Sequence, residues 1–127
     1  MAEDKPQSTL DEIRAGVGDL SAIELFNNQI LVGIWIRPEK TKGGIILTSK
    51  TQDEDRWQGK VAVVLKKGPT AFVDDGSVAF KGQDVSLGDW VVFKTSDGFP
   101  LDVNGVRCRV VEDVHLKAKV SDPAMIY

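Results

Sequence analysis

Short runs with an apolar residue at every second position fill the chain from Ile23 to Val120, and this period constrains the fold more than any other feature. Successive side chains of a β-strand point to opposite faces, so each such run predicts a strand with at least one buried face. The runs with this character are Ile30 to Ile36, Val61 to Leu65, Val106 to Val110 and Val114 to Val120, and the short run Trp90 to Phe93 is apolar on both faces. The pattern predicts an all-β fold.

The residue pairs between these runs favour tight antiparallel turns. Asn104-Gly105 separates two short apolar runs, and both central positions of a type I′ hairpin need a positive φ, which Asn and Gly tolerate. Asp75-Gly76 predicts a second hairpin and Asp97-Gly98 a third turn. Several short strands joined in this way predict a small antiparallel β-barrel or sandwich. A chain of 127 residues has room for one such domain.

Residues 1–20 differ in character and are expected to form an N-terminal arm. They hold five acidic and two basic residues, and so a net charge of −3, equal to that of the whole chain. Thr9 followed by Glu12 resembles a capping box, and Gly16 and Gly18 would cut a helix short. Apolar residues recur at helical spacing at Leu10, Ile13, Val17 and Leu20. We predict about two helical turns, either on a solvated tail or on a segment that docks on a partner.

The composition excludes several classes of function. One Cys and one His leave no internal disulfide and no Cys-based or multi-histidine metal site. A net charge of −3 gives no concentrated positive field, so nucleic acid is not an expected partner. The longest apolar stretch, Ile30 to Ile36, is too short to span a bilayer, and a reducing compartment such as the cytoplasm fits. We expect a structural role for His115, a buried inert thiol at Cys108, no cofactor and no catalysis.

One segment, Glu39 to Gly59, breaks the strand pattern. It is about twenty residues long and polar at both ends, with Gly43-Gly44 directly before Ile45-Ile46-Leu47. A loop of this length without its own secondary structure is uncommon in a compact domain and is often functional. The three aliphatic residues are either a strand folded back onto the core or a plug for a groove elsewhere. The pattern leaves both interpretations open.

The segment Pro38 to Thr48, PEKTKGGIILT, resembles the mobile loop of the GroES family, the ten-kilodalton co-chaperonins, which reads roughly E-x-K-T-x-G-G-I-[VI]-L. The order of further segments is also similar to that family over about 100 residues, from Ile23 to Val120. These segments are Asn27 to Val32, Gln58 to Val64, Val73 to Val78, Asp84 to Phe93 and Val110 to Val114. Asp84 to Phe93, DVSLGDWVVF, resembles the family's D-V-K-V-G-D-x-V-x-F.

The resemblance implies an irregular antiparallel β-barrel at residues 21–120, with a mobile loop at about 39–59, a roof hairpin at about 71–80 and a tail at 121–127. It also implies a homo-oligomeric dome, normally a heptamer, that caps a GroEL-like chaperonin ring and assists ATP-dependent folding. The chaperonin-binding residues would be Gly43, Gly44, Ile45, Ile46 and Leu47. The roof hairpin would carry Asp74, Asp75 and Gly76. In a single subunit, strand edges at Asn27 to Ile36 and at Val114 to Val120 would be left unpaired.

The sequence departs from the family pattern near both ends of the barrel. The family's H-D-R is replaced by Asn27-Asn28-Gln29, and the closing strand, Asp113 to Val120, carries two lysines. This drift favours a divergent, phage-encoded copy acting in the host cytoplasm. The alternative is a virion structural protein, a capsid decoration or head–tail component built on a GroES-like barrel, with capsid proteins as partners. The arm and the tail would then be assembly contacts.

Overall fold

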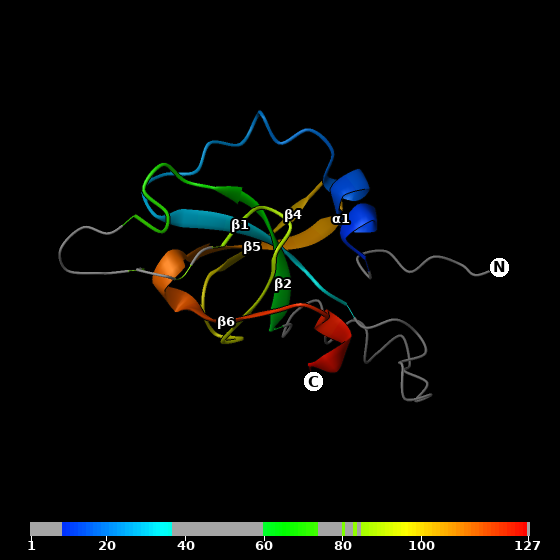
Figure 1. Cartoon of the computed structure of the whole chain (residues 1–127). Coiled ribbons are helices and arrows are strands. Elements are labelled where there is room, and N and C mark those ends of the chain that lie inside the picture. The colour runs from blue at the N-terminus through cyan, green and yellow to red at the C-terminus, as the bar shows by residue number, and fades with distance from the viewer. Residues whose placement is uncertain (1–8, 37–59, 74–79, 81–82, 84, 127) are drawn as a thin grey trace.

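The structure, a computed structural model, describes residues 9–36, 60–73, 80, 83 and 85–126. Six strands in this part of the chain form one antiparallel sheet in the order β4-β5-β1-β2-β3-β6 (Figure 1). The strands are β1 (Gln29–Ile34), β2 (Val61–Lys67), β3 (Trp90–Phe93), β4 (Phe99–Val103), β5 (Val106–Glu112) and β6 (Leu116–Val120). The other elements are helix α1 (Leu10–Val17) and two 3₁₀ helices, η1 (Asp113–His115) and η2 (Pro123–Met125). The predicted all-β class is confirmed.

The sheet curls so that strands far apart in its order meet across one face. Phe93 on β3 and Val111 on β5 belong to the same apolar cluster, although β1 and β2 lie between their strands. The Arg109 guanidinium on β5 also lies 5.6 Å from the centre of the Phe93 ring. A flat sheet would hold these side chains about 14 Å apart, at roughly 4.8 Å per strand. The inner cluster consists of Ile30, Val32, Ile34, Ile36, Ala62, Val64, Val91, Phe93 and Val111.

A second apolar cluster lies on the outer face of the same sheet. Leu31 and Val63, which alternate with residues of the inner cluster along β1 and β2, point to this side. Helix α1 covers the face with Ile13 and Val17, both of which are fully buried. The outer cluster consists of Ile13, Val17, Leu25, Leu31, Val63, Leu65, Val103, Val106 and Cys108. The arm was expected to be solvated or to dock on a partner; its helix instead packs on the sheet of its own chain.

The predicted capping signal defines the start of α1. The Glu12 N–H donates to Thr9 Oγ1 at 3.1 Å, and the Thr9 hydroxyl donates to the Glu12 carboxylate at 3.2 Å. The helix ends at Val17, and the next residue, Gly18, caps it with a φ of 71°, in the left-handed region; the Gly18 N–H donates to the Arg14 carbonyl. The short amphipathic helix predicted from the sequence is therefore confirmed.

The turns agree with the sequence where they are described. Asn104 and Gly105 have φ values of 51° and 87° and join β4 to β5 in the predicted two-residue hairpin. Gly98, with a φ of 89°, lies in the predicted turn between β3 and β4. Of the hairpin predicted around Asp75-Gly76, at about 71–80, residues 74–79 lie outside the described residues, and Ala71 and Phe72 form a turn where a strand was expected.

Two predictions about the strands need correction. The expected open edge at Asn27 to Ile36 is wrong, because β1 pairs with β2 on one side and β5 on the other. The closing run also does not begin as a strand at Val114, since Asp113–His115 form η1 and β6 starts at Leu116. In the described sheet, β4 and β6 are the edge strands.

Candidate functional site

The two ends of the predicted mobile loop are attached to the sheet side by side. Strand β1 ends at Ile34, and the chain is described as far as Ile36 and again from Lys60, just before β2. The Trp35 N–H donates to the Val61 carbonyl at 2.9 Å, and the Phe93 N–H donates to the Lys60 carbonyl at 3.0 Å. Trp35 and Ile36 are buried. The described residues on both sides of the predicted loop are therefore bonded to neighbouring strands of the sheet.

The chaperonin-binding residues predicted within this segment lie outside the described residues. They are Gly43, Gly44, Ile45, Ile46 and Leu47. Their contacts stay a prediction. The described residues fix only where such a loop starts and ends.

The base of the predicted roof hairpin lies at the other end of the β1–β2 pair. The antiparallel register joins Ile34 to Ala62 at the loop end and Ile30 to Lys67 at the opposite end. Four residue steps along β1, from Ile30 to Ile34, separate these ends by about 13 Å. After β2, the Gly68 N–H donates to the Gln29 carbonyl at 2.7 Å. A Cβ on Gly68 would lie 2.5 Å from the Asn27 carbonyl oxygen, so this close approach requires glycine.

Asp113 joins three segments at the roof-hairpin base. Its side chain is buried, and its carboxylate accepts hydrogen bonds from Asn28 Nδ2 and from the Phe72 N–H, both at 2.9 Å. The Asp113 N–H donates to the Asn28 carbonyl at 3.2 Å. Phe72 has a φ of 62°, a strained value for a bulky residue, so the Asp113 carboxylate helps to hold an unfavourable backbone conformation.

Sequence reasoning missed this role of Asp113. Asn28 stood out only as a departure from the family pattern. The one available signal was an acidic residue at the end of an alternating apolar run. The signal is weak, because such residues are usually solvated.

Aromatic and cationic contacts close the same base. The Phe72 and Phe80 rings meet edge to face, with centres 5.5 Å apart. Lys67 Nζ lies 5.8 Å from the centre of the Phe72 ring and donates to the Val85 carbonyl at 2.9 Å. The two chain segments that flank the predicted hairpin, at Phe72 and at Phe80, are thus in contact, while Asp74, Asp75 and Gly76 lie outside the described residues.

The two edge strands of the sheet differ in their capacity to pair with another strand. Val103 and Val106, beside the two-residue turn, form a hydrogen-bonded pair. Along β4 such pairs alternate with pairs that are not hydrogen-bonded to each other, and Pro100 belongs to the second kind, so its backbone groups point outward. Proline has no N–H to donate, so this edge is blunted. On β6 the outward edge carries no proline, and Lys117 to Lys119 are exposed. A neighbouring strand can pair with β6 more readily than with β4.

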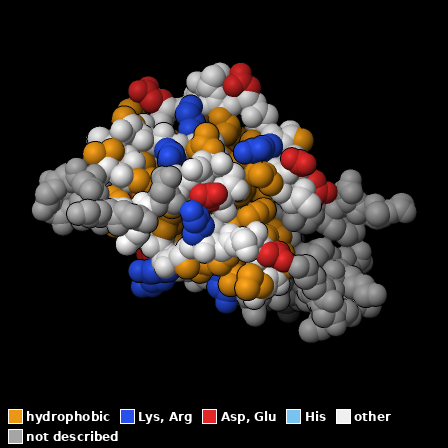
Figure 2. Space-filling view, in the orientation of Figure 1, with side chains coloured by type: hydrophobic (Ala, Val, Ile, Leu, Met, Phe, Trp, Pro, Cys, Tyr) orange, Lys and Arg blue, Asp and Glu red, His pale blue; other side chains and the backbone are white. Residues whose placement is uncertain are grey.

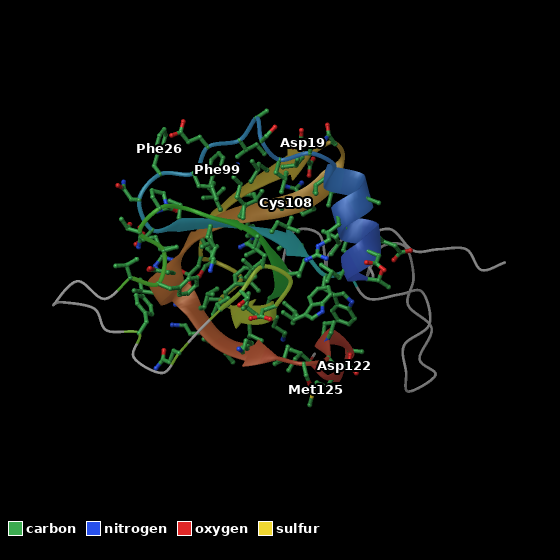
Figure 3. All side chains as sticks on the ribbon, turned by 45° about the horizontal axis from the view of Figure 1, so that its top comes forward. Asp19, Phe26, Phe99, Cys108, Asp122 and Met125 are labelled. Atoms are coloured by element: carbon green, nitrogen blue, oxygen red, sulfur yellow. The ribbon has the colours of Figure 1, made fainter. Side chains whose placement is uncertain are left out.

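The two side chains considered as candidates for reactivity, Cys108 and His115, lie in surroundings that indicate structural roles. Burial, helped by the negative charge of Asp102, raises the pKa of the Cys108 thiol to about 12, so the thiol is protonated and unreactive at neutral pH. Figure 3 shows Cys108 inside the molecule, close to α1. His115 lies in η1 rather than in a strand, and its Nδ1 is buried without a hydrogen bond in the described chain.

Among the described residues, no three His, Cys, Asp or Glu side chains gather as they would around a metal ion. None of the described helices has the length and apolar character needed to cross a membrane. On the face shown in Figure 2, acidic and basic side chains are interspersed with apolar ones.

A curled antiparallel sheet, with one long segment inserted between its two central strands and a second at their opposite end, is consistent with the barrel that the resemblance implies. Residues 22–120 match the family model described as the chaperonin 10 Kd subunit, and the chain belongs to this family. No curated protein matches the chain. Family membership assigns the chain to the co-chaperonins, which work with a GroEL-like chaperonin, form oligomers and are not enzymes. Helix α1 and residues 121–127 lie outside the matched segment.

Proposed function

We propose that this protein is a co-chaperonin that caps a chaperonin ring through the loop at 39–59, with Gly43, Gly44, Ile45, Ile46 and Leu47 as the contact. The observation that carries the proposal is the attachment of both loop ends to adjacent buried strands. The Trp35–Val61 hydrogen bond and the Lys60–Phe93 hydrogen bond hold these ends. A loop fixed at its base and aliphatic at its centre suits insertion into an apolar groove.

The chemistry of such a loop explains reversible capping. Burying one aliphatic side chain of this size contributes roughly 1.5–3 kcal/mol. Ordering the loop on binding costs conformational entropy and keeps each single contact weak. A ring of seven subunits presents seven loops at high effective concentration, so the whole cap binds tightly. Release within an ATP-driven cycle then needs only a modest weakening of each contact.

The position of β6 at one edge of the described sheet supports the oligomeric part of the proposal. Its outward backbone groups can pair with a segment of a neighbouring copy, and repetition of that contact closes a ring. We propose a heptamer of this kind, acting in the cytoplasm of a cell or, for a phage-encoded copy, of the host. The roof hairpin with Asp74, Asp75 and Gly76 would extend from a base held by Asp113.

We do not put forward the virion structural role as a second function. In that role the arm and the tail would be assembly contacts. The described helix of that arm buries Ile13 and Val17 on its own sheet.

The test is Ile46→Asp, with Thr48→Asp as a control that adds the same charge beside the aliphatic triplet. Co-sedimentation with a chaperonin ring in the presence of ADP measures binding, and thermal unfolding measures the barrel. We expect Ile46→Asp to abolish co-sedimentation with a nearly unchanged melting temperature, and Thr48→Asp to retain binding. Wild-type protein that never co-sediments, together with an Ile46→Asp protein that unfolds, would overturn the proposal.

A further inference from the structure

Helix α1 fits the outer face of the sheet through two glycines, one on each side of the contact. A Cβ on Gly33 of β1 would lie 2.7 Å from Ile13 Cγ2, and a Cβ on Gly16 of α1 would lie 2.5 Å from Val106 Cγ2. Real Cβ atoms do not approach other atoms so closely. The absence of both side chains lets Ile13 reach the strand and the helix backbone reach β5. Both surfaces of the contact, β1 at Gly33 and α1 at Gly16, therefore lack the side chain that would keep them apart.

Polar side chains of the barrel hold the chain that leaves α1. Asn104 Nδ2 donates to the Val17 carbonyl at 2.6 Å and satisfies one of the orphan acceptors at the end of the helix. Lys66 Nζ donates to the Leu20 carbonyl at 2.8 Å and also to the Ile23 carbonyl. Asp19 caps a local turn by accepting from the Ser21 N–H, a bond that lowers the pKa of its carboxyl. The segment is fixed from α1 to Ile23.

The backbone of this segment is not part of the sheet ladder. Its backbone hydrogen bonds are local ones, from Ile13 to Thr9, from Gly18 to Arg14 and from Ile23 to Leu20. The links to the barrel are apolar packing and the side-chain bonds of Asn104 and Lys66. The helix can therefore leave the sheet without breaking a strand pair, although its departure would uncover a large apolar face.

The covered face would be costly to expose in a single subunit. It includes Leu31, Val63 and Cys108, all three fully buried, together with Val103 and Val106. The part of the chain that matches the family begins at residue 22, after the helix has ended. The barrel thus carries an apolar outer face, and an added element of the same chain closes it.

We infer that α1 is an intramolecular clasp that completes the subunit and uncouples its folding from assembly. The chain covers its outer face with its own helix, so a single subunit is folded before any neighbour joins it. The inference rests on the oligomeric state in the proposed function but not on chaperonin binding. Its tests use no chaperonin, and a failure of either proposal is visible separately.

The first experiment uses Cys108, the single cysteine of the chain, as a reporter of the clasp. A thiol reagent reacts with Cys108 only when the outer face opens, and the rate of labelling in native buffer reports that opening. Ile13→Ala removes the central side chain of the clasp, whereas Ala15→Gln changes an exposed position of the same helix. We expect labelling at least about thirtyfold faster in Ile13→Ala, which corresponds to about 2 kcal/mol at 1.4 kcal/mol per factor of ten.

The control Ala15→Gln should label within about twofold of the wild type, because an exposed helix position filled by a good helix former changes little. Equal labelling rates in Ile13→Ala and the wild type would overturn the clasp.

The second experiment dilutes the protein until its oligomer dissociates, with size measured by light scattering and folding by circular dichroism. We expect wild-type subunits to stay folded after dissociation, with Cys108 still protected. A variant lacking residues 1–18 should unfold as it dissociates, so its melting temperature should fall with dilution. The milder Ile13→Ala variant should show a smaller fall in the same direction. Wild-type subunits that unfold on dissociation, or a truncated variant that remains folded as a monomer, would overturn the inference.

Discussion

The inner and outer apolar clusters lie on the two faces of one sheet, and they are closed in different ways. The inner cluster is closed by the sheet itself, because the curl brings Phe93 on β3 against Arg109 on β5 and into one cluster with Val111. The outer cluster is closed by α1, which comes from outside the family-matched segment. One core is a property of the barrel, and the other depends on an addition to it.

This difference follows from the two central strands. Ile30 and Val32 of β1 point inward while Leu31 points outward, and all three are fully buried. A strand that is apolar on both faces needs a cover on both. Curling covers only the inside of the sheet. The second cover must come from another element, and in this chain it is α1.

The largest effect is expected from Phe93→Ala, which acts on the inner cluster. The Phe93 ring is almost fully buried and lies beneath the Arg109 guanidinium, so its removal leaves a large cavity. We expect a loss of about 3–5 kcal/mol in the free energy of unfolding, measured by urea denaturation. Cys108 labelling should accelerate only in step with global unfolding, because the inner cluster opens with the whole barrel.

Phe93→Leu is the matched control, since it retains most of the apolar volume and should cost clearly less. If Phe93→Ala accelerated Cys108 labelling and left the global stability unchanged, the two clusters would not be independent in the way described.

A smaller effect is expected from Gly33→Ala, at the contact between β1 and the clasp. The new Cβ would press on Ile13 Cγ2, and overpacking of this kind costs about 1–3 kcal/mol. The double variant Gly33→Ala with Ile13→Ala removes the atom that clashes. Its loss of stability in urea should therefore be smaller than the sum of the two single losses. Strictly additive losses would show that Gly33 and Ile13 do not meet.

Much of the fold could be predicted from the sequence, because the signals involved are local. The period of two along β1, β2 and β5, the Asn104-Gly105 turn and the Thr9–Glu12 cap each depend on neighbouring residues. The docking of α1 could not be predicted in this way. Its partners Gly33 and Val106 are distant in sequence, and a glycine within a strand does not reveal which side chain fills the space above it.

The curl of the sheet limits prediction in a similar way. Arg109 stands opposite Cys108 in the alternation of β5, where a charged residue would ordinarily face solvent. The curl instead buries it, and its guanidinium donates to the carbonyls of Thr95 and Asp97. For the candidate site, the loop motif predicted the position of the insertion between β1 and β2. The hydrogen bonds of Asp113 with Asn28 and Phe72 could not be predicted in this way, because these residues are far apart in the sequence.

The smallest effect is expected from alkaline pH, and it is confined to the outer cluster. Burial beneath α1 raises the pKa of the Cys108 thiol to about 12, whereas an unfolded cysteine titrates near pH 8.5. Above that pH the unfolded chain loses a proton that the folded chain keeps. The thiol therefore contributes stability below about pH 8.5 that is lost as the pH rises.

Between pH 8 and pH 10 we expect this loss to reach about 1–2 kcal/mol in the free energy of unfolding, measured by urea denaturation at each pH. Cys108→Val, which keeps an apolar side chain of similar size, should lack this component while sharing the titration of every other group. The difference between the two proteins therefore isolates the thiol. Because the inner cluster contains no titrating side chain, Phe93→Leu should keep the full wild-type pH dependence. A wild-type protein and a Cys108→Val variant with parallel pH profiles would show that the clasp does not keep water from the outer cluster.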